Sequence, residues 1–211
     1  MAVVASTPRL SLQCEAIAKD TSTIRSLDWD RSRFDIEFGL RNGTTYNSFL
    51  VRGERTALID TSHLKFEGIW LELLKEQIDP KAIDVLIVSH TEPDHSGLVG
   101  HVIDLNPDIE VVGSKVAIQF LENQVHRPFK SRAVKSGEEL DLGTNPESGI
   151  QHRFEFLSAP TCTGRTRSFP STTAPGSSTP AMPSACTTAP RTASMCTPAP
   201  SLPTSASITT A

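Results

Sequence analysis

The composition of the chain changes abruptly near residue 161, and this break limits which residues can build a folded core. From Cys162 to Ala211 the sequence contains no Asp, Glu, Lys or His and consists mostly of Ser, Thr, Ala and Pro. Such a segment buries too little apolar surface to offset the backbone entropy that is lost on folding. We therefore expect a folded domain within residues 1–161 and a disordered tail over residues 162–211.

The first 161 residues contain strand-like and helix-like segments in a recognisable order. Their hydrophobic patterns predict strands, a turn at residues 26–30 with a hairpin turn at Asn42-Gly43, and two helices, the second capped by Ser114. The expected strands are 9–17, 34–40, 45–53, 55–63, 83–89, 109–113, 138–142 and 152–158, and the expected helices are 65–77 and 114–124. Strands come first and then alternate with helices, which predicts an α/β sandwich with mixed sheets rather than a doubly wound parallel sheet.

Charge, hydropathy and cysteine content exclude several classes of protein. The net charge of −4 gives no electrostatic case for binding nucleic acid. No window approaches 18 consecutive apolar residues, and the first residues lack the pattern of a secretory signal. Cys14 is the only cysteine before residue 162, which is typical of a reducing compartment. We therefore expect a cytoplasmic protein with no membrane span and no nucleic-acid partner.

The segment Val88–Gly97, VSHTEPDHSG, carries the strongest chemical signal in the chain. An apolar strand ends there, and four potential metal ligands follow within six residues: His90, Glu92, Asp94 and His95. Imidazole and carboxylate groups together suit divalent metals of the first transition row. His90 and Glu92 can face one ion while Asp94 and His95 face a second. The density of ligands therefore predicts a two-metal site.

The alternative interpretation of this segment is a solvated turn, since interleaved charges usually face water. Its position directly after a buried strand, where α/β folds place their sites, favours the metal interpretation. Asp60 ends the preceding strand and could orient a ligand or simply occupy a turn. The remaining histidines are isolated in sequence and are expected to be structural or exposed, with His63 the one that could lie near the site; the others are His101, His126 and His152.

The motif His-x-Glu-x-Asp-His after a strand resembles the metallo-β-lactamase fold in the variant found in flavodiiron proteins. Zinc hydrolases of that fold usually carry a second histidine where this chain has Glu92, and a carboxylate favours iron over zinc. The segments SLDWDRSRFDIEFGL, TTYNSFLVRG and VAIQFLENQVHRPFK also resemble the cyanobacterial diflavin branch of that family. The resemblance covers about residues 9–161. It implies an αββα sandwich that is incomplete in this chain, which makes residues 1–161 a partial diiron domain.

The resemblance implies an oxidoreductase that reduces dioxygen to water at a non-haem diiron centre fed by FMN; some relatives reduce nitric oxide. The residues that match His90 and Glu92 bind one iron, those that match Asp94 and His95 bind the other, and the remaining ligands come later in the chain. In the family FMN occupies a flavodoxin-like domain, and a head-to-tail homo- or heterodimer brings it near the partner's irons. This chain has no glycine-rich phosphate loop, so we expect no flavin or nicotinamide site within it.

The tail has the composition expected of a GC-rich gene translated out of frame. If Thr161–Ser168 is encoded by ACC TGC ACT GGC CGG ACA CGA TCN, the frame that begins at the last base of the Thr161 codon reads Leu-His-Trp-Pro-Asp-Thr-Ile. The hidden His straddles Cys162 and Thr163, and a hidden Asp straddles Ala181 and Met182, at the spacing of the family's later ligands. The alternative is a natural low-complexity tail.

Two further hypotheses about function remain open from the sequence. One is a zinc hydrolase of the metallo-β-lactamase fold, such as a thioesterase or a glyoxalase II-like enzyme, which metal analysis would distinguish. The other is a truncated product without activity, because part of the core and the later ligands are missing from the frame as written.

Overall fold

The computed structural model describes residues 9–34, 38–158 and 168–172. Its largest element is a seven-stranded mixed sheet with the order β1-β2-β5-β6-β7-β8-β9. Pairing is antiparallel from β1 to β6 and parallel from β6 to β9. The strands are β1 (Leu10–Ala18), β2 (Thr21–Asp28), β5 (Thr44–Arg52), β6 (Thr56–Ile59), β7 (Val85–Ile87), β8 (Glu110–Ser114) and β9 (Ser131–Val134).

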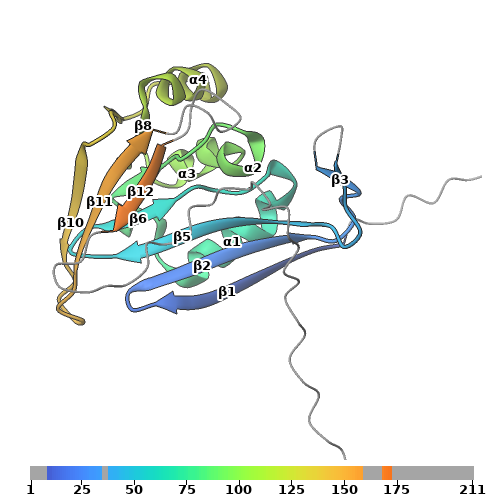
Figure 1. Cartoon of the computed structure of the whole chain (residues 1–211), viewed down its shortest axis with the longest axis horizontal. Coiled ribbons are helices and arrows are strands. Elements are labelled where there is room, and N and C mark those ends of the chain that lie inside the picture. Colours follow the sequence, from blue (N-terminus) through green and yellow to red (C-terminus); the bar gives the residue numbers. More distant parts are fainter. Residues whose placement is uncertain (1–8, 35–37, 159–167, 173–211) are drawn as a thin grey trace, which may run out of the picture.

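Helices cover one face of this sheet (Figure 1). They are α1 (Glu67–Gln77), α2 (Pro93–Ser96), α3 (Val99–Leu105) and α4 (Lys115–Val125), with short 3₁₀ turns at Leu64–Phe66 and Pro80–Ala82. Trp70 of α1, Val102 of α3 and Leu121 of α4 are fully buried in one cluster with Leu58 and Leu86 of the sheet. Ser114 caps α4 by accepting a hydrogen bond from the Ala117 amide at 3.1 Å, as the sequence predicts.

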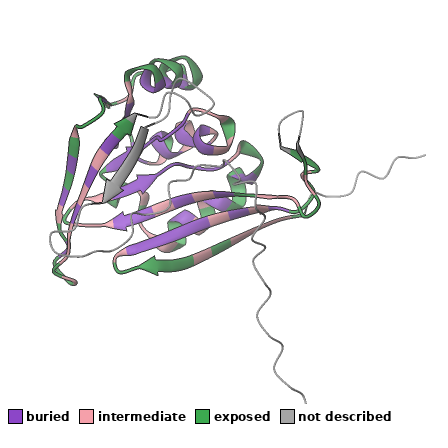
Figure 2. Cartoon of the chain, viewed as in Figure 1, coloured by how far each residue is buried: buried purple, intermediate pink, exposed green. Residues whose placement is uncertain are grey.

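A three-stranded antiparallel sheet packs on the opposite face. It consists of β10 (Glu139–Thr144), β11 (Gln151–Ser158) and β12 (Ser168–Thr172). Phe154 and Phe156 of β11 pack with Ile59 and Ile87, whose neighbours in the same strands face the helices. The central strands are therefore buried on both faces, which explains their continuous apolar runs. Figure 2 shows these strands as largely buried, whereas the edge strand β1 is largely exposed.

The mixed α/β sandwich confirms the predicted fold class. The described structure supplies one helical layer and two sheets that pack on each other, and no described helix contributes a residue to the core between these two sheets. Whether the αββα sandwich is incomplete stays a prediction, because residues 159–167 and 173–211 lie outside the described residues. Within the same residues, no helix is both long and apolar enough to cross a membrane.

The structure differs from the predicted elements in the first half of the chain. A strand, β2, continues to Asp28 where the sequence suggested a turn from residue 26, and β9 was not predicted. Residues 34–40 do not form one strand: the two-residue strands β3 (Arg33–Phe34) and β4 (Phe38–Gly39) pair with each other, and residues 35–37 lie outside the described residues. Gly43 does form a turn, with φ of 74°. However, the strand that follows it, β5, pairs with β2 and not with residues 34–40.

One short stretch of the tail differs from the expectation of disorder. Residues 168–172 form β12, which pairs antiparallel with β11 along its open edge. Backbone hydrogen bonds with an open edge do not depend on side-chain identity, and Pro170 is tolerated because β12 is an edge strand. Residues 159–167 and 173–211, on which most of the tail prediction rests, lie outside the described residues.

Candidate metal centre

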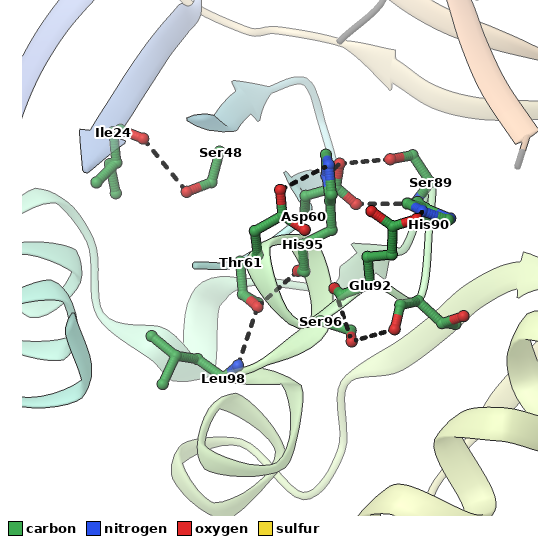
Figure 3. Close-up of polar contacts among 12 residues, drawn as sticks. Ile24, Ser48, Asp60, Thr61, Ser89, His90, Glu92, His95, Ser96 and Leu98 are labelled. Carbon is green, nitrogen blue, oxygen red and sulfur yellow. Dashed lines mark hydrogen bonds and ion pairs between the residues drawn. The ribbon is translucent and has the colours of Figure 1, made fainter. Parts of the chain in front are cut away.

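The four predicted ligands lie where two parallel strands end. β6 and β7 pair in parallel, so their carboxyl ends meet at the same edge of the large sheet. Asp60 directly follows β6, and the loop from Ser89 to His95 follows β7. The amide of Asp60 still donates to the carbonyl of Ile87 at 2.8 Å, which holds the two loops side by side. Figure 3 shows the side chains of Asp60, Ser89, His90, Glu92 and His95 gathered at this edge.

The ligands lie in two close pairs. His90 Nε2 is 2.7 Å from Glu92 Oε1, and His95 Nε2 is 3.7 Å from Asp94 Oδ2. The rings of His90 and His95 face each other edge to plane, with 5.6 Å between their centroids. His90 and His95 are buried, whereas the side chain of Glu92 is 44% exposed. These are the pairs that the sequence assigned to two separate ions.

The loop does not form a closed binding site by itself. Among the residues that the structure describes, no three His, Cys, Asp or Glu side chains form a group that could hold a metal ion. Tetrahedral or octahedral ions need more than two protein ligands for a stable site. Within the described residues the loop therefore presents pairs of donors and no larger group.

Asp60 holds both His95 and the start of the loop. One carboxylate oxygen accepts a hydrogen bond from the Ser89 amide at 2.8 Å, and the other accepts from the Ser89 hydroxyl and from His95 Nδ1 at 2.9 Å (Figure 3). Asp60 is 1% exposed and adopts a left-handed conformation with φ of 56°. Metal-binding histidines characteristically donate their second ring N–H to a carboxylate. With its Nδ1 proton directed at Asp60, His95 presents the Nε2 lone pair, so Asp60 is both a strand-end turn and an orienting residue.

The electrostatic field at His95 favours a cation. Burial lowers the pKa of His95, but the negative charges of Asp60, Asp94 and Glu92 outweigh it and raise the pKa to about 9. Three carboxylates that stabilise a proton on this ring would also stabilise a metal ion bound to it. The donor types and the field therefore fit a transition-metal site.

The backbone around the loop leaves no room for a side chain at Gly97. Pro93 occupies the first position of α2, where its missing N–H is not needed. A Cβ on Gly97 would lie 2.5 Å from the Pro93 carbonyl oxygen and within 2.9 Å of backbone atoms of Ser62 and Leu64. Only glycine lets the segment after β6 approach the helix turn that carries Asp94 and His95.

The other histidines lie around this loop or far from it. His63 is half-buried, stacks on Tyr46 with 6.0 Å between centroids, and accepts from the Lys65 amide through Nδ1. Burial, Lys65 and Arg31 lower its pKa, while the charges of Asp94 and Asp28 oppose them. His101 pairs with Glu67 at 3.3 Å, His126 ends α4 in a left-handed conformation, and His152 bonds Asp20 at 3.1 Å.

Spacing in the sequence did not identify several residues that support the loop. Ser89 and Thr61 bond to Asp60 and to the His95 carbonyl respectively, and Gln124 of α4 bonds Ser96. The hydroxyl of Tyr46, whose ring stacks on His63, donates to Asp28 at 3.1 Å and accepts from Arg31 at 2.8 Å. Most of these contacts join residues far apart in the chain, so no local pattern marks them. Only the position of Ser89, directly before His90, was a usable signal.

Comparison with known proteins identifies the family of the chain. The family model described as the ODP family beta lactamase matches residues 44–163. A diflavin flavoprotein of a Nostoc species is 64% identical over 152 residues, which is 72% of this chain and 25% of that protein. Diflavin flavoprotein A 1 of a Synechocystis species is 61% identical over 152 residues, again 72% of this chain and 26% of its own length.

Solved structures of flavodiiron proteins share the fold of this chain. The metal-soaked flavodiiron core from a Synechocystis species superimposes with a TM-score of 0.69 at 29% identity, over 80% of this chain and 40% of that one. Rubredoxin oxygen:oxidoreductase from Desulfovibrio gigas gives a TM-score of 0.67 at 27% identity, over 75% and 38% of the two chains. The chain spans about a quarter of the length of the diflavin flavoproteins that it matches. By this family match and these relatives, the chain belongs to the ODP family of β-lactamase-like domains, in the diflavin branch of the flavodiiron proteins.

Proposed function

We propose that His90, Glu92, Asp94 and His95 supply part of a diiron centre in an oxidoreductase that reduces dioxygen. The observation that carries this proposal is the arrangement of the loop: two ligand pairs side by side, with His95 oriented by the buried carboxylate of Asp60. In a solvated turn His90 and His95 would not be buried, and His95 would not be held by the carboxylate of Asp60. The family of the chain supports the same interpretation.

The ligand types fit iron. Glu92 and Asp94 make half of the loop's donors carboxylates, which are hard ligands that favour iron in its higher oxidation state. When bound, a pair of irons would supply the electrons and the binding site for dioxygen. The protein's part is to hold the ligands in place before metal arrives, and the buried, hydrogen-bonded His95 is placed to do so.

The exposure of the two pairs is unequal. The side chains of His95 and Asp94 are 11% and 13% exposed, and that of Glu92 is 44% exposed. Asp94 and His95 are thus fixed by their surroundings, whereas Glu92 can still adjust when a metal or a small substrate approaches. We propose that entry to the centre is on the Glu92 side.

The complete reaction belongs to the longer architecture of the relatives. Reduction of dioxygen to water needs four electrons, which FMN in a separate domain would deliver, and a head-to-tail dimer would bring that flavin close. Nitric oxide is the alternative diatomic substrate. We propose that this chain, in the frame as written, is inactive because the later ligands are absent from it, and that the intact protein acts in the cytoplasm.

Metal preference tests the proposal. The chain is loaded anaerobically with ferrous iron and zinc in competition, and bound metal is measured by elemental analysis. We expect iron to be favoured more in the wild-type chain than in Glu92→His, which creates the pattern of the zinc hydrolases. Glu122→His, on the exposed face of α4, is the matched control and should leave the preference unchanged. A wild-type chain that prefers zinc as strongly as Glu92→His would favour the hydrolase hypothesis instead.

A further inference from the structure

Thr61 makes a set of contacts with the ligand loop that no ligand role explains. It is 0% exposed and follows Asp60 directly. Its amide and its hydroxyl both donate to the carbonyl oxygen of His95 at 2.7 Å, and the hydroxyl oxygen accepts from the Leu98 amide at 3.2 Å (Figure 3). One buried hydroxyl thus bridges His95, a candidate ligand, and Leu98, the residue directly before the next helix.

These contacts interrupt what would otherwise be one helix. The short helix α2 ends at Ser96 and α3 begins at Val99. In a continuous helix the Leu98 amide would donate to the carbonyl four residues earlier, that of Asp94. It donates to Thr61 instead, and Leu98 takes φ of −108° and ψ of 7°, outside the helical range. The hydroxyl therefore satisfies the polar groups that the break exposes.

Asp60 and Thr61 together hold His95 at two points. Asp60 bonds the ring through Nδ1, and Thr61 bonds the backbone carbonyl of the same residue. A ring held at one nitrogen can still swing if its backbone moves, whereas a residue fixed at both ends has one orientation. The left-handed turn at Asp60 is what allows consecutive side chains to reach both points.

We propose that the Thr61 hydroxyl is a positioning element of the metal centre: by breaking the helix between α2 and α3 it sets the direction of His95 Nε2. This inference rests on the proposed function for its effect on metal affinity, and on geometry alone for its effect on the loop.

The test compares Thr61→Val with Thr61→Ser in the full chain. Valine keeps the shape and the amide but removes the hydroxyl, whereas serine keeps the hydroxyl and loses the methyl group. Thr23→Val is the matched control, because Thr23 is 4% exposed and its hydroxyl also donates to a carbonyl, that of Ser48 at 3.2 Å on β5. All variants are compared by urea unfolding so that metal affinity is corrected for the folded fraction.

Three readouts are measured: cobalt(II) affinity from visible absorption, exchange of the Leu98 amide proton, and the NMR signal of the His95 Nδ1 proton. For Thr61→Val we expect a cobalt dissociation constant about tenfold higher, the size typical of outer-shell changes. We also expect faster exchange at Leu98 and a shifted His95 signal. Thr61→Ser and Thr23→Val should resemble the wild type in all three.

The other possible results either overturn the proposed role of Thr61 or separate it from the proposed metal function. Unchanged Leu98 exchange and an unchanged His95 signal in Thr61→Val would overturn the proposal. An equal loss of affinity in Thr23→Val would also overturn it, since a general loss of stability would then explain the effect. If no variant binds cobalt, the metal function proposed for this chain fails, but Leu98 exchange and the His95 signal still decide whether Thr61 positions the loop.

Discussion

At Asp60 the backbone adopts a left-handed conformation, with φ of 56°, which only Gly, Asn and Asp visit at little steric penalty. The carboxylate then accepts hydrogen bonds from Ser89 and His95 in the interior. The turn thus places a buried carboxylate where it can hold two segments together. Asn can adopt the same backbone, so Asp60→Asn tests the carboxylate separately from the turn.

Asp60→Asn is expected to weaken metal binding about 10–100-fold, the range for changes behind a histidine ligand. An amide must turn its N–H group either toward Ser89 or toward His95, and the second choice forces the proton of His95 onto Nε2, where the metal should bind. Cobalt(II) titration measures the effect. Asp20→Asn is the control: Asp20 also has a left-handed conformation, with φ of 63°, and also bonds a histidine, His152. Equal affinities in the two variants would contradict the orienting role of Asp60.

Gly97→Ala is expected to destabilise the protein by about 1–3 kcal/mol, because the added Cβ meets three backbone atoms that cannot move independently. Urea unfolding checks this. Gly100→Ala, one turn later in α3, has nothing within 4 Å of the added Cβ and should stabilise by up to about 1 kcal/mol through helix propensity. Similar effects of the two substitutions would show that the close approach at Gly97 is not required.

Tyr46 offers a direct measurement, since it is the only tyrosine in the chain. Burial raises its pKa to about 12, although Arg31 opposes the shift. We expect the ultraviolet absorbance of tyrosinate to appear with a midpoint near 12 in the folded protein and near 10 in urea. A raised pKa contributes stability that is complete below pH about 10 and is lost as the pH rises toward 12. A folded-state midpoint near 10 would mean that the Tyr46 hydroxyl is not enclosed.

At the scale of elements, the sequence predicted strands and helices wherever one face or both faces are apolar. The buried runs of β6, β7 and β8 and the amphipathic α1 and α4 were all predicted to within a few residues. The strand β2 was missed because Thr21, Ser22, Thr23 and Ser26 are buried although polar, and their burial follows from pairing with β1 and β5. Strands β9 and β12 were missed because edge pairing uses backbone groups, which leave no mark on composition.

In the candidate site, too, the sequence identified some residues and missed others. Four candidate ligands in six residues after an apolar strand could be identified from the sequence, and the structure places them in two close pairs; their role as ligands stays a prediction. The residues that hold them, Thr61 and Gln124 among them, come from other loops and helices. Their role depends on tertiary contacts, for which a single sequence provides no spacing rule.

The cap of α4 is an element whose contribution can be measured alone. Ser114→Ala removes the hydroxyl that accepts from the Ala117 amide and should destabilise the protein by about 1 kcal/mol. Ser114→Asp keeps an acceptor at the cap and should remain near the wild type. Thermal unfolding of the three proteins tests this. If Ser114→Asp lost as much as Ser114→Ala, the stabilisation would not come from capping.

At the scale of the whole molecule, the described residues and the resemblance to relatives each cover about three quarters of the chain. The resemblance ends where the composition changes. The family match stops at residue 163, and relatives align over 72% of this chain. Beyond that point only β12 is described. The second sheet ends with the short strand β12, and the candidate ligands of the Ser89–His95 segment lie in two pairs. We expect the family's later segments to add both strands and ligands to them.

The last prediction is that inserting one base into the gene restores both the missing strand segment and the missing metal ligands. Inserting one base directly after the Thr161 codon shifts translation into the frame that reads Leu-His-Trp-Pro, followed by a strand-forming segment and an Asp. That frame would return a histidine ligand and a carboxylate able to bridge two ions. Loss of a bridging carboxylate removes a ligand from both metals at once. We expect the shifted version to bind close to two irons per chain and the version as written to bind fewer.

An insertion of three bases at the same point, which adds a residue without changing the frame, is the control and should not raise iron content. Elemental analysis after anaerobic loading measures the difference, and oxygen uptake with a supplied flavin-domain partner shows whether activity follows. Two irons per chain in both versions would mean that the tail as written is a genuine part of the protein.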